Sequence, residues 1–472
     1  MQFDLFKLHD QELDIGNQSW ICFKGKKIPK IISELRNQII KDRKLGSTKD
    51  LCRLVSNKIN SNPWSVEQVL YGHKKWVPIP IIKSLTDLSN NPGFYRKKIV
   101  ENTFYLKCNS ATSKPIIAVK RLNILLCKIA GAHAADGNIY SNLNLEIKNK
   151  TRFRSIIKEV NKSCKEVSII NTKGKIRIRA KIKDFKLVPK INREDVTIFI
   201  RNQINLTEGS LNAVKAYKKW VFLCFKLDTE VRKHNKKNAW FVDFGNKIIC
   251  RYLTKFLDFP SGKKTLTVEE PSIIKNSLQR FRKSFLLGFM TFEGHVPPHI
   301  KHIECSSKSK MLIKNVRDIF TQLQIPLKVK KDGYDRWVCR SLTLNKKQLM
   351  NCMDLFEKNT EKWQRINEKM NGFTTRFRDI KRTKKIFDNA YPPRFNNVGI
   401  TSLFEEIYNA KKVKHSVLKQ KMRIDNSTLT RYLRTLRECH IINSMNGNRV
   451  LELNNDKDEW RLPSEIYKNG RL

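Results

Sequence analysis

The sequence predicts an α+β protein built on an internal duplication, with a helical module at each end. Two nonapeptides carry this prediction, Ile129–Gly137 (IAGAHAADG) and Leu286–Gly294 (LLGFMTFEG). Each has a small or apolar run, a glycine and, five residues later, an acid followed at once by another glycine. The acids, Asp136 and Glu293, are 157 residues apart (293 − 136), and the inner glycines have the same spacing. Two motifs in one register indicate two copies of a structural unit, each with a carboxylate at an equivalent place.

The segments that follow each nonapeptide predict further matching elements. Alternating apolar and polar residues predict strands, and apolar residues at helical spacing predict a helix between them. In the first half, 111–270, we expect strands at Asn144–Lys148, Glu166–Ile170 and Lys175–Ile182 and a helix at Arg152–Asn161. In the second half, 271–368, we expect strands at Lys301–Cys305, Leu327–Lys331 and Trp337–Leu344 and a helix at Lys310–Leu323.

The first 110 residues predict a small helical domain. Ile31–Lys41 is amphipathic, and Ser47 is placed to cap a second helix. Ser65 is a candidate N-cap for a third helix, with Gln68 at the capping-box position. The stretch SVEQVLYGHKKWVPIPIIKSL resembles the recognition-helix half of helix-turn-helix domains of the Cro-repressor type. That resemblance implies DNA contacts by Lys74 and Lys75, and an ordinary helical bundle remains the alternative.

The last part of the chain predicts a second helix-turn-helix module at 399–472, after a basic linker at 369–398. Helices are expected at Thr401–Asn409, Ser416–Met422 and Ser427–Cys439. Two apolar runs flank Asn446-Gly447, which is a strong hairpin signal. A hairpin after a recognition helix indicates a winged helix. The residues of its third helix expected to contact DNA are Arg431, Arg434 and Arg437.

The charge balance predicts a polyanionic partner. Lys and Arg number 94 against 44 Asp and Glu, which gives a formal net charge of +50. An excess of one sign repels itself and destabilises the compact state unless a counter-charge binds. Nucleic acid supplies that charge at high density, whereas no basic amphipathic helix stands apart to suggest a membrane surface.

The cysteines and the N-terminal residues indicate the cellular compartment in which we expect the protein. The eleven cysteines include no C-x-x-C pair, so we expect reduced thiols and no zinc ribbon. No apolar stretch approaches the length of a membrane span, and the opening MQFDLFKLHD is unlike a signal peptide. We expect a cytoplasmic, nucleoid-associated protein with no membrane partner.

The two nonapeptides resemble the motifs of the LAGLIDADG homing endonucleases, in the single-chain form with two motifs. The resemblance covers roughly Ile116 to Arg365, about half of the chain. It implies a monomer with a pseudo-twofold, duplicated αββαββα core and saddle-shaped antiparallel sheets. Those sheets would lie in the major groove of double-stranded DNA, where base edges are read directly. Lys308 and Lys310 are expected among the DNA contacts of the second half.

The motif residues fit this resemblance physically. Glycine in mid-helix costs about 1 kcal/mol relative to alanine, a cost that makes sense where Gly131 and Gly288 let two helices pack closely. The glycine after each acid is expected to end its helix. An acid at a helix C-terminus is disfavoured by the helix dipole, and a bound cation offsets that penalty. Asp136 and Glu293 are therefore expected to hold Mg²⁺ and to be catalytic, since this ion prefers oxygen ligands.

Further site residues follow from the resemblance alone. In that family the carbonyl of the residue before each acid also binds metal, which corresponds here to Ala135 and Phe292. A basic residue near each scissile phosphate corresponds to Lys264 and Lys362, with Lys263 and Lys358 as alternatives. His133, where the family has a small or apolar residue, is expected to be packed or hydrogen-bonded rather than a ligand.

Three functions remain open. The first is a site-specific DNA endonuclease that cuts both strands across the minor groove with the help of metal ions. The second is a transcription regulator of the same fold, a group that typically lacks the metal-binding acids. The third is a maturase that binds intron RNA, because the same basic surface would serve it.

Overall fold

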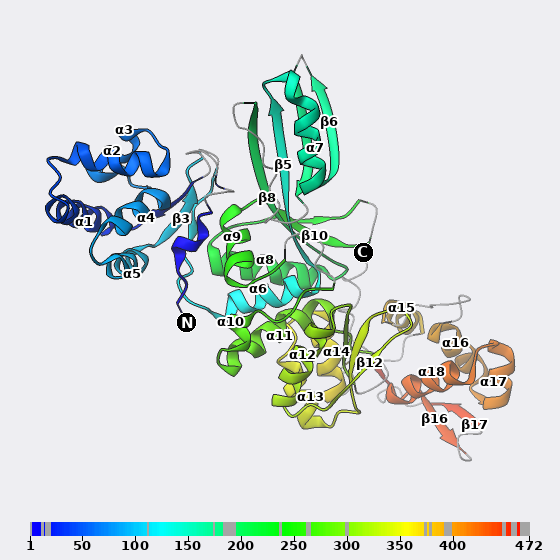
Figure 1. Ribbon diagram of the computed structural model, residues 1–472. Helices are drawn as coiled ribbons and strands as arrows, with labels where there is room; N and C mark the ends of the chain where they lie inside the picture. The colour runs from blue at the N-terminus through cyan, green and yellow to red at the C-terminus, as the bar shows by residue number, and fades with distance from the viewer. Residues whose placement is uncertain are drawn as a thin grey trace. The chain divides into compact units, whose positions relative to one another are not determined.

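The computed structural model of the chain describes residues 2–10, 14, 20–110, 113–172, 175–182, 195–235, 238–260, 266–297, 302–371, 375–376, 380–390, 399–445, 450–454 and 460–462. It combines helices with antiparallel sheets (Figure 1). The chain divides into two compact units. Unit 1 comprises Met1–Leu206, Tyr217–Val231 and Val242–Phe285, and unit 2 comprises Thr207–Ala216, Arg232–Phe241 and Leu286–Leu472.

Unit 1 begins with a helical module that is completed by a small antiparallel sheet of order β2-β1-β3-β4. Its helical elements are η1 (Leu5–Leu8), α1 (Ile28–Asp42), α2 (Thr48–Ile59), α3 (Pro63–Leu70), α4 (Ile79–Leu88) and α5 (Pro92–Asn102). Its strands are β1 (Ile21–Lys24), β2 (Val77–Pro78), β3 (Tyr105–Cys108) and β4 (Ile116–Ile117).

Two helix starts in this module were predicted from capping residues. The prediction for Ser47 is confirmed, because its side chain accepts the N–H of Asp50 at the start of α2. The prediction for Ser65 is wrong. Helix α3 begins at Pro63, and Asn62 caps it by accepting the N–H of Trp64 at 2.9 Å. Proline at the first helical position fixes a helical φ without losing a hydrogen bond, so the helix starts one turn earlier.

The rest of unit 1 is organised around a six-stranded antiparallel sheet of order β6-β7-β5-β8-β10-β9. The strands are β5 (Gly137–Ile147), β6 (Cys164–Thr172), β7 (Lys175–Ile182), β8 (Val196–Glu208), β9 (Val231–Lys233) and β10 (Trp240–Phe244). The helical elements are α6 (Ile124–Ala135), η3 (Lys150–Arg152), α7 (Phe153–Ser163), α8 (Leu211–Phe225), α9 (Lys247–Arg251), η4 (Tyr252–Phe256) and α10 (Ser272–Lys275). Helix α7 packs its apolar side against β5 and β7 (Figure 1).

Strand β5 is longer than its sequence pattern predicts. It begins directly after α6 and pairs along its whole length with β8, from Gly137 opposite Leu206 to Ile147 opposite Val196. The predicted strand covered only its last part, since polar residues interrupt the alternation before Asn144. The early part of β5 is therefore a strand because its backbone pairs with β8, although its side chains alone do not predict one.

Unit 2 contains the part of the second motif helix from Leu286 on and a three-stranded sheet of order β11-β13-β12. Its elements are α11 (Gln279–Glu293), β11 (Glu304–Ser307), α12 (Lys310–Gln322), β12 (Leu327–Lys331), β13 (Trp337–Ser341), α13 (Lys346–Met353) and α14 (Glu361–Asn371). The predicted helix at Lys310–Leu323 and strand at Leu327–Lys331 are confirmed. Helices α7 and α12 begin at Phe153 and Lys310, which are again 157 residues apart (310 − 153).

The C-terminal part of unit 2 has a core of its own. Its elements are α15 (Ile380–Ala390), α16 (Ile400–Ala410), β15 (Lys412–Lys414), α17 (His415–Met422), α18 (Asn426–Glu438), β16 (Ile442–Met445) and β17 (Val450–Leu453), with the short pair β14 (Thr375–Arg376) and β18 (Arg461–Leu462). The order of the larger sheet is β15-β17-β16. Asn446 and Gly447, the predicted hairpin turn, lie outside the described residues, and Met445 pairs with Val450 on either side of them.

The segment expected to be a basic linker differs from that expectation. Helix α15 lies within it, and the side chains of Ile386 and Phe387 are buried in the C-terminal core. The ring centroids of Phe387 and Phe404 are 5.8 Å apart in an edge-on contact. Lysines and arginines dominate this stretch, so its narrow apolar stripe is easily overlooked; the stripe is nevertheless enough to attach the helix to the core.

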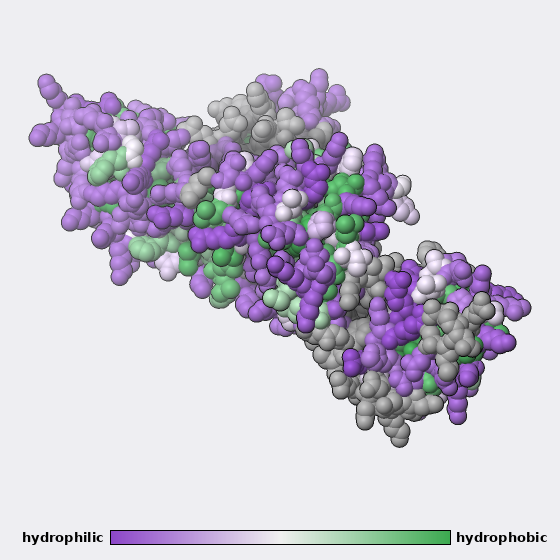
Figure 2. Space-filling model, turned by 90° about the horizontal axis from the view of Figure 1, so that it is seen from below, coloured by the Kyte–Doolittle hydropathy of each residue, from purple (hydrophilic) through white to green (hydrophobic). Residues whose placement is uncertain are grey.

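Hydrophilic residues cover most of the described surface on the face drawn in Figure 2. No helix among the described residues has both the length and the apolar character that crossing a bilayer requires.

A buried charge cluster attaches the N-terminal segment to α9 and η4. The carboxylate of Asp14 lies 3.1 Å from His9 Nδ1 and 3.3 Å from Arg251 Nη2, and it also pairs with Lys247. Asp10 pairs with Arg251 and Lys255. Burial raises the pKa of Asp14, but the hydrogen bond with His9 and the charges of Lys247 and Arg251 outweigh burial and hold the pKa well below its usual range.

We expect Asp14→Asn to lower the free energy of unfolding by about 3 kcal/mol at pH 7, because it leaves buried cations without their counter-charge. A carboxyl group whose pKa is depressed by folding stabilises the fold above its unfolded-state pKa, about 4, and this contribution is lost as the pH falls further. The difference between variant and wild type should therefore be smaller near pH 3, as measured by urea unfolding. Asp228→Asn, at a 75% exposed side chain paired with Lys218, is the control and should change little.

Candidate functional site

Helix α6 is built to be buried on every side. Asn123 caps it by accepting the N–H of Leu126 at 2.8 Å. Eight of its residues are buried, including Gly131 and the alanines beside it. A helix that is apolar all round belongs in a protein interior rather than at a surface. The helix therefore acts as a fixed support for the residue that ends it, Asp136.

The turn after α6 places Asp136 at the helix end and starts β5 at the next residue. The N–H of Asp136 donates to the carbonyl of Ala132 at 3.1 Å, and the side chain is half-buried. A Cβ on Gly137 would lie 2.6 Å from the Cα of His133, which no real structure tolerates. Gly137 follows the end of α6, as predicted, but its φ is not positive, so it does not stop the helix in a left-handed conformation. The residue must be glycine because the backbone passes too close to the last helical turn.

His133 is packed and hydrogen-bonded, as the sequence analysis expected. Its Nε2 lies 2.7 Å from the hydroxyl oxygen of Tyr217, and its exposed fraction is 1%. Burial raises the pKa of Tyr217, so the phenol stays neutral. The histidine thus joins α6 to α8 within unit 1.

Helix α11 ends in unit 2 with the same acid–glycine sequence, and Lys362 contacts its last carbonyls. The ammonium of Lys362, on α14, donates to the carbonyl oxygen of Thr291 at 2.9 Å and to that of Phe292. The hydroxyl of Thr291 accepts the N–H of Glu357 at 3.1 Å, which ties the same turn to the start of α14. The negative end of the helix dipole attracts a cation to these carbonyls.

Glu293 itself is half-buried and held by β11. The hydroxyl of Ser306 donates to Oε1 of Glu293 at 2.9 Å. The neighbouring Cys305 faces Cys339 across the sheet. A hydrogen bond with Cys339 and burial raise the pKa of Cys305, and the charge of Glu293 adds to the effect. The thiol therefore stays protonated near the carboxylate. Because only a thiolate binds metal ions, oxygen atoms are the metal ligands available here.

Gly294 repeats the constraint found at Gly137. A Cβ there would lie 2.4 Å from the carbonyl oxygen of Met290 and 3.0 Å from Cε1 of Phe356. The φ of Gly294 is also not positive, so this glycine too is required by a close approach rather than by a left-handed conformation. Each unit thus presents one carboxylate at the end of a buried helix.

The donor set suits a hard divalent cation that is shared with a substrate. Among the described residues, no group of three or more His, Cys, Asp or Glu side chains is placed to hold a metal. Mg²⁺ usually keeps several waters and takes one or two carboxylates plus phosphate oxygens. One carboxylate at a helix end in each unit fits that demand, and in unit 2 the carbonyls of the same helix end bind the Lys362 ammonium.

The remaining predicted residues lie as follows. Gly131 and Gly288 are both buried within their helices. Lys264 and its alternative Lys263 lie outside the described residues, whereas Lys358 is exposed. Lys74 and Lys75 follow α3 in the N-terminal module, and Lys308 and Lys310 are exposed at the start of α12. The ammonium of Lys310 lies 5.0 Å from the ring of Trp337.

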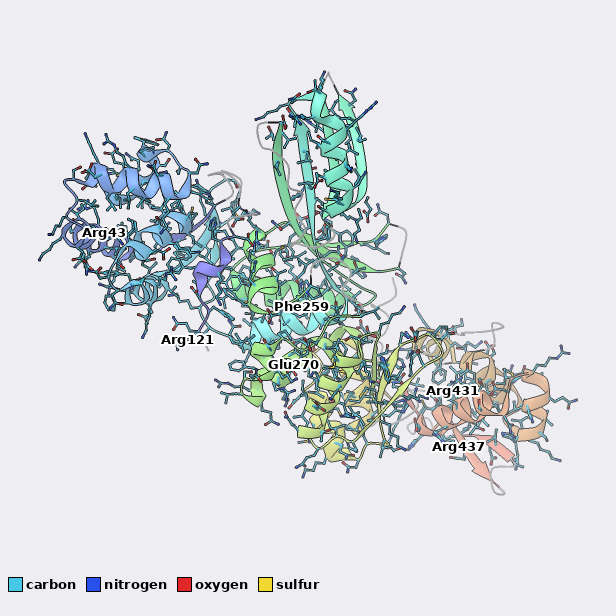
Figure 3. All side chains as sticks on the ribbon, in the orientation of Figure 1. Arg43, Arg121, Phe259, Glu270, Arg431 and Arg437 are labelled. Carbon is cyan, nitrogen blue, oxygen red and sulfur yellow. The ribbon has the colours of Figure 1, made fainter. Side chains whose placement is uncertain are left out.

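The arginines of α18 share one side of that helix. Arg431 and Arg434 are exposed and Arg437 is half-buried, at intervals of three residues. Figure 3 shows Arg431 and Arg437 projecting from α18. Burial lowers the pKa of Arg437, and the nearby charge of Arg434 adds to this. Like charges at this spacing repel one another, so an anion bound here would relieve the repulsion.

The site contains one residue that the sequence did not reveal. Ser306 reaches Glu293 because β11 brings it there, and a lone serine in a short strand carries no signal of such a role. The spacing of the nonapeptides, by contrast, identified both acids.

Comparisons with known proteins complete the description. No protein-family model matches the chain, and no curated protein matches it. A structure of mesophilic variants of the homing endonuclease I-DmoI is 12% identical over 50% of this chain and 92% of its own, with a TM-score of 0.29. The homing endonuclease I-WcaI bound to its DNA recognition sequence is 10% identical over 49% and 80%, with a TM-score of 0.27. Full-length DUF199/WhiA from Thermatoga maritima is 13% identical over 50% and 82%, with a TM-score of 0.24. At these scores the likeness carries no argument about function.

We expect Gly294→Ala to destabilise unit 2 by about 2 kcal/mol or more, because the new methyl group meets backbone that cannot move aside. Gly333→Ala is the matched control, since a Cβ there meets nothing within 4 Å. Thermal unfolding followed by circular dichroism compares the two. Equal stability of both variants would show that the tight turn after Glu293 is not required.

Proposed function

We propose that the protein is a site-specific endonuclease that cuts both strands of DNA by metal-dependent phosphodiester hydrolysis. The observation that carries the proposal is the repeated helix end. Two buried helices, 157 residues apart in register, each finish on an acid that is followed by a glycine. Core packing alone accounts for one such turn but gives no reason for a second acid at the equivalent place.

In this proposal Asp136 and Glu293 bind divalent cations, Mg²⁺ being the expected ion, against the phosphodiester. The carbonyls of Ala135 and Phe292 are the further oxygen ligands, and the Phe292 carbonyl would exchange its hydrogen bond from the Lys362 ammonium for the cation. When bound, such ions activate water and stabilise the leaving oxygen. The chain's own contribution is to fix the carboxylates on rigid helix ends and to orient Glu293 through Ser306.

Lys362 has a distinct role in the proposal. Its ammonium lies against the carbonyl of the residue that precedes Glu293, so a positive charge is positioned at the helix end that carries this acid. We infer that it contacts the scissile phosphate and stabilises the charge that develops in the transition state. Lys264 is proposed for the same role in the first half.

The outer modules would extend the contact with double-stranded DNA. The order helix, strand, helix, helix, strand, strand from α16 to β17 is that of a winged helix, and α18 is then the recognition helix with Arg431, Arg434 and Arg437. In the N-terminal module, α2 and α3 are joined by a short turn with Asn60 at φ 49°, as in a helix-turn-helix. Lys74, Lys75, Lys308 and Lys310 supply further phosphate contacts.

A regulator built on the same fold would bind DNA without needing the acids. The retention of both acids on required glycine turns favours the nuclease. An intron-RNA maturase would share the basic surface. The test below distinguishes it from a nuclease by comparing binding to intron RNA with binding to DNA.

The test is cleavage of DNA carrying the target locus, by purified protein with Mg²⁺. We expect Asp136→Asn and Glu293→Gln each to lower the cleavage rate at least ~100-fold, since each removes a metal ligand at the reacting phosphate. DNA affinity measured in EDTA should stay within about threefold of wild type. Asp354→Asn is the control, an exposed acid that also caps a helix C-terminus in unit 2, and it should cut normally.

Tight DNA binding without any metal-dependent cutting would point to the regulator and contradict the proposal. Preference for structured intron RNA over the DNA site, again without cutting, would point to the maturase.

We expect Lys362→Met to slow cleavage by about 100-fold while leaving DNA affinity nearly unchanged, because its charge acts on the transition state rather than on the duplex at large. Lys358→Met, in the same segment but exposed, is the matched control and should retain activity. Single-turnover cleavage rates at saturating protein measure the difference. If both variants lose the same activity, the lysines of this segment serve only as general phosphate contacts.

A further inference from the structure

Helix α3 and the loop after it expose aromatic side chains that the proposed cleavage does not use. Trp64 is 60% exposed and Tyr71 is 48% exposed. His73 is exposed too, and its ring lies nearly parallel to that of Tyr71, with centroids 6.2 Å apart. Large aromatic side chains left in water on a folded module mark a binding surface rather than a core. We call Trp64, Tyr71 and His73 the aromatic cluster.

Cations lie over two rings of the aromatic cluster. The ammonium of Lys74 is 5.9 Å from the ring of Trp64, and the guanidinium of Arg36 is 5.5 Å from that of Tyr71. Arg36 is itself fixed, since it donates to the carbonyl of Leu70 at 3.1 Å. Each ring thus has a cation over one face, and that cation can pair with the phosphate of a nucleotide whose base stacks on the exposed part of the ring.

The backbone that carries the aromatic cluster is well determined by hydrogen bonds. Asn62 caps α3 through the N–H of Trp64. After the helix, Gly72 takes a φ of +76°, and the N–H groups of His73 and Lys74 both donate to the carbonyl of Gln68. The rings are therefore presented from a fixed turn, and ordering them on binding costs little.

The charge around the aromatic cluster indicates which kind of ligand binds there. From residue 63 to residue 76, Glu67 is the only acid, against Lys74 and Lys75. A protein partner would meet this surface with apolar or acidic side chains, but the chain as a whole carries +50 and calls for a polyanion. Nucleic acid has both the phosphates for the lysines and the flat bases for the rings.

We propose that the aromatic cluster binds single-stranded nucleic acid by stacking on unpaired bases. In a duplex the base faces are covered by their neighbours, so exposed rings gain nothing there, whereas in a single strand every base presents a face. Lys74 and Lys75 serve phosphates of either form. This activity is separate from cleavage and does not require the metal or the acids Asp136 and Glu293.

The test uses the full-length protein in EDTA at one fixed salt concentration, because affinity for nucleic acid is steeply salt-dependent. The probes are oligothymidylate, oligouridylate and a duplex, each of about 12 nucleotides per strand. We expect the double variant Trp64→Ala, Tyr71→Ala to bind the single strands about 10-fold more weakly, while its duplex affinity changes less than about twofold. The two single strands show whether DNA or RNA is preferred.

The matched control is Phe94→Ala on α5. Phe94 is 53% exposed and has the Lys98 ammonium 5.7 Å from its ring, but it lies outside the aromatic cluster. It should leave single-strand affinity unchanged. Trp64→Phe should keep most of the affinity yet remove part of the tryptophan fluorescence quenching that wild type shows on binding.

Three results would overturn the proposal. These are unchanged single-strand affinity in the double variant, an equal loss of duplex affinity, or an equal loss in Phe94→Ala. The second result would instead assign the aromatic cluster to duplex recognition by α3.

Discussion

The structure depends on two backbone turns that only glycine can make. Each carboxylate of interest is the final residue before a turn so tight that a side chain at the next position would overlap the preceding helical turn. The acid therefore cannot drift away from the helix end. Its position there is electrostatically unfavourable, because the helix end is already negative. In unit 2 the ammonium of Lys362, which donates to the last carbonyls of α11, offsets this penalty.

Outside these turns, the excess of positive charge is the main influence on binding and stability. Acids are scarce relative to lysine and arginine, and several described acids pair with cations, as Asp14 does with Lys247 and Arg251. Most cations are left to repel one another across the surface. A bound polyanion would relieve that repulsion, so binding and stability are coupled through the same charges. The arginines of α18 illustrate this, since burial and the charge of Arg434 both lower the pKa of Arg437.

Local patterns predicted much of the fold, and tertiary contacts decided what they missed. Spacing and alternation located α12, β12 and the helix ends at Asp136 and Glu293, because those signals lie within a few residues of one another. Strand β8 was missed although apolar residues alternate along it from Val196 to Leu206, whereas the early part of β5 was missed because polar residues interrupt its alternation and pairing with β8 makes it a strand. Ser306 was missed because its role comes from a neighbour thirteen positions away in the chain. Helix α15 was not predicted because its many lysines and arginines suggested a basic linker.

The two motif acids occupy equivalent sequence positions but have different surroundings. This difference affects which DNA sequence each half would recognise under the proposed function. After Asp136 the chain runs straight into an eleven-residue strand. After Glu293 it forms an isolated bridge between His295 and Glu304, the first residue of β11, and the longer acid is held by a serine from that strand. A twofold-symmetric DNA-binding protein is matched to a palindromic site, because its two halves present the same side chains. Two halves joined in one chain are free to diverge, as these have. On the proposed function, each half would then contact a different half-site, and the target need not be symmetric.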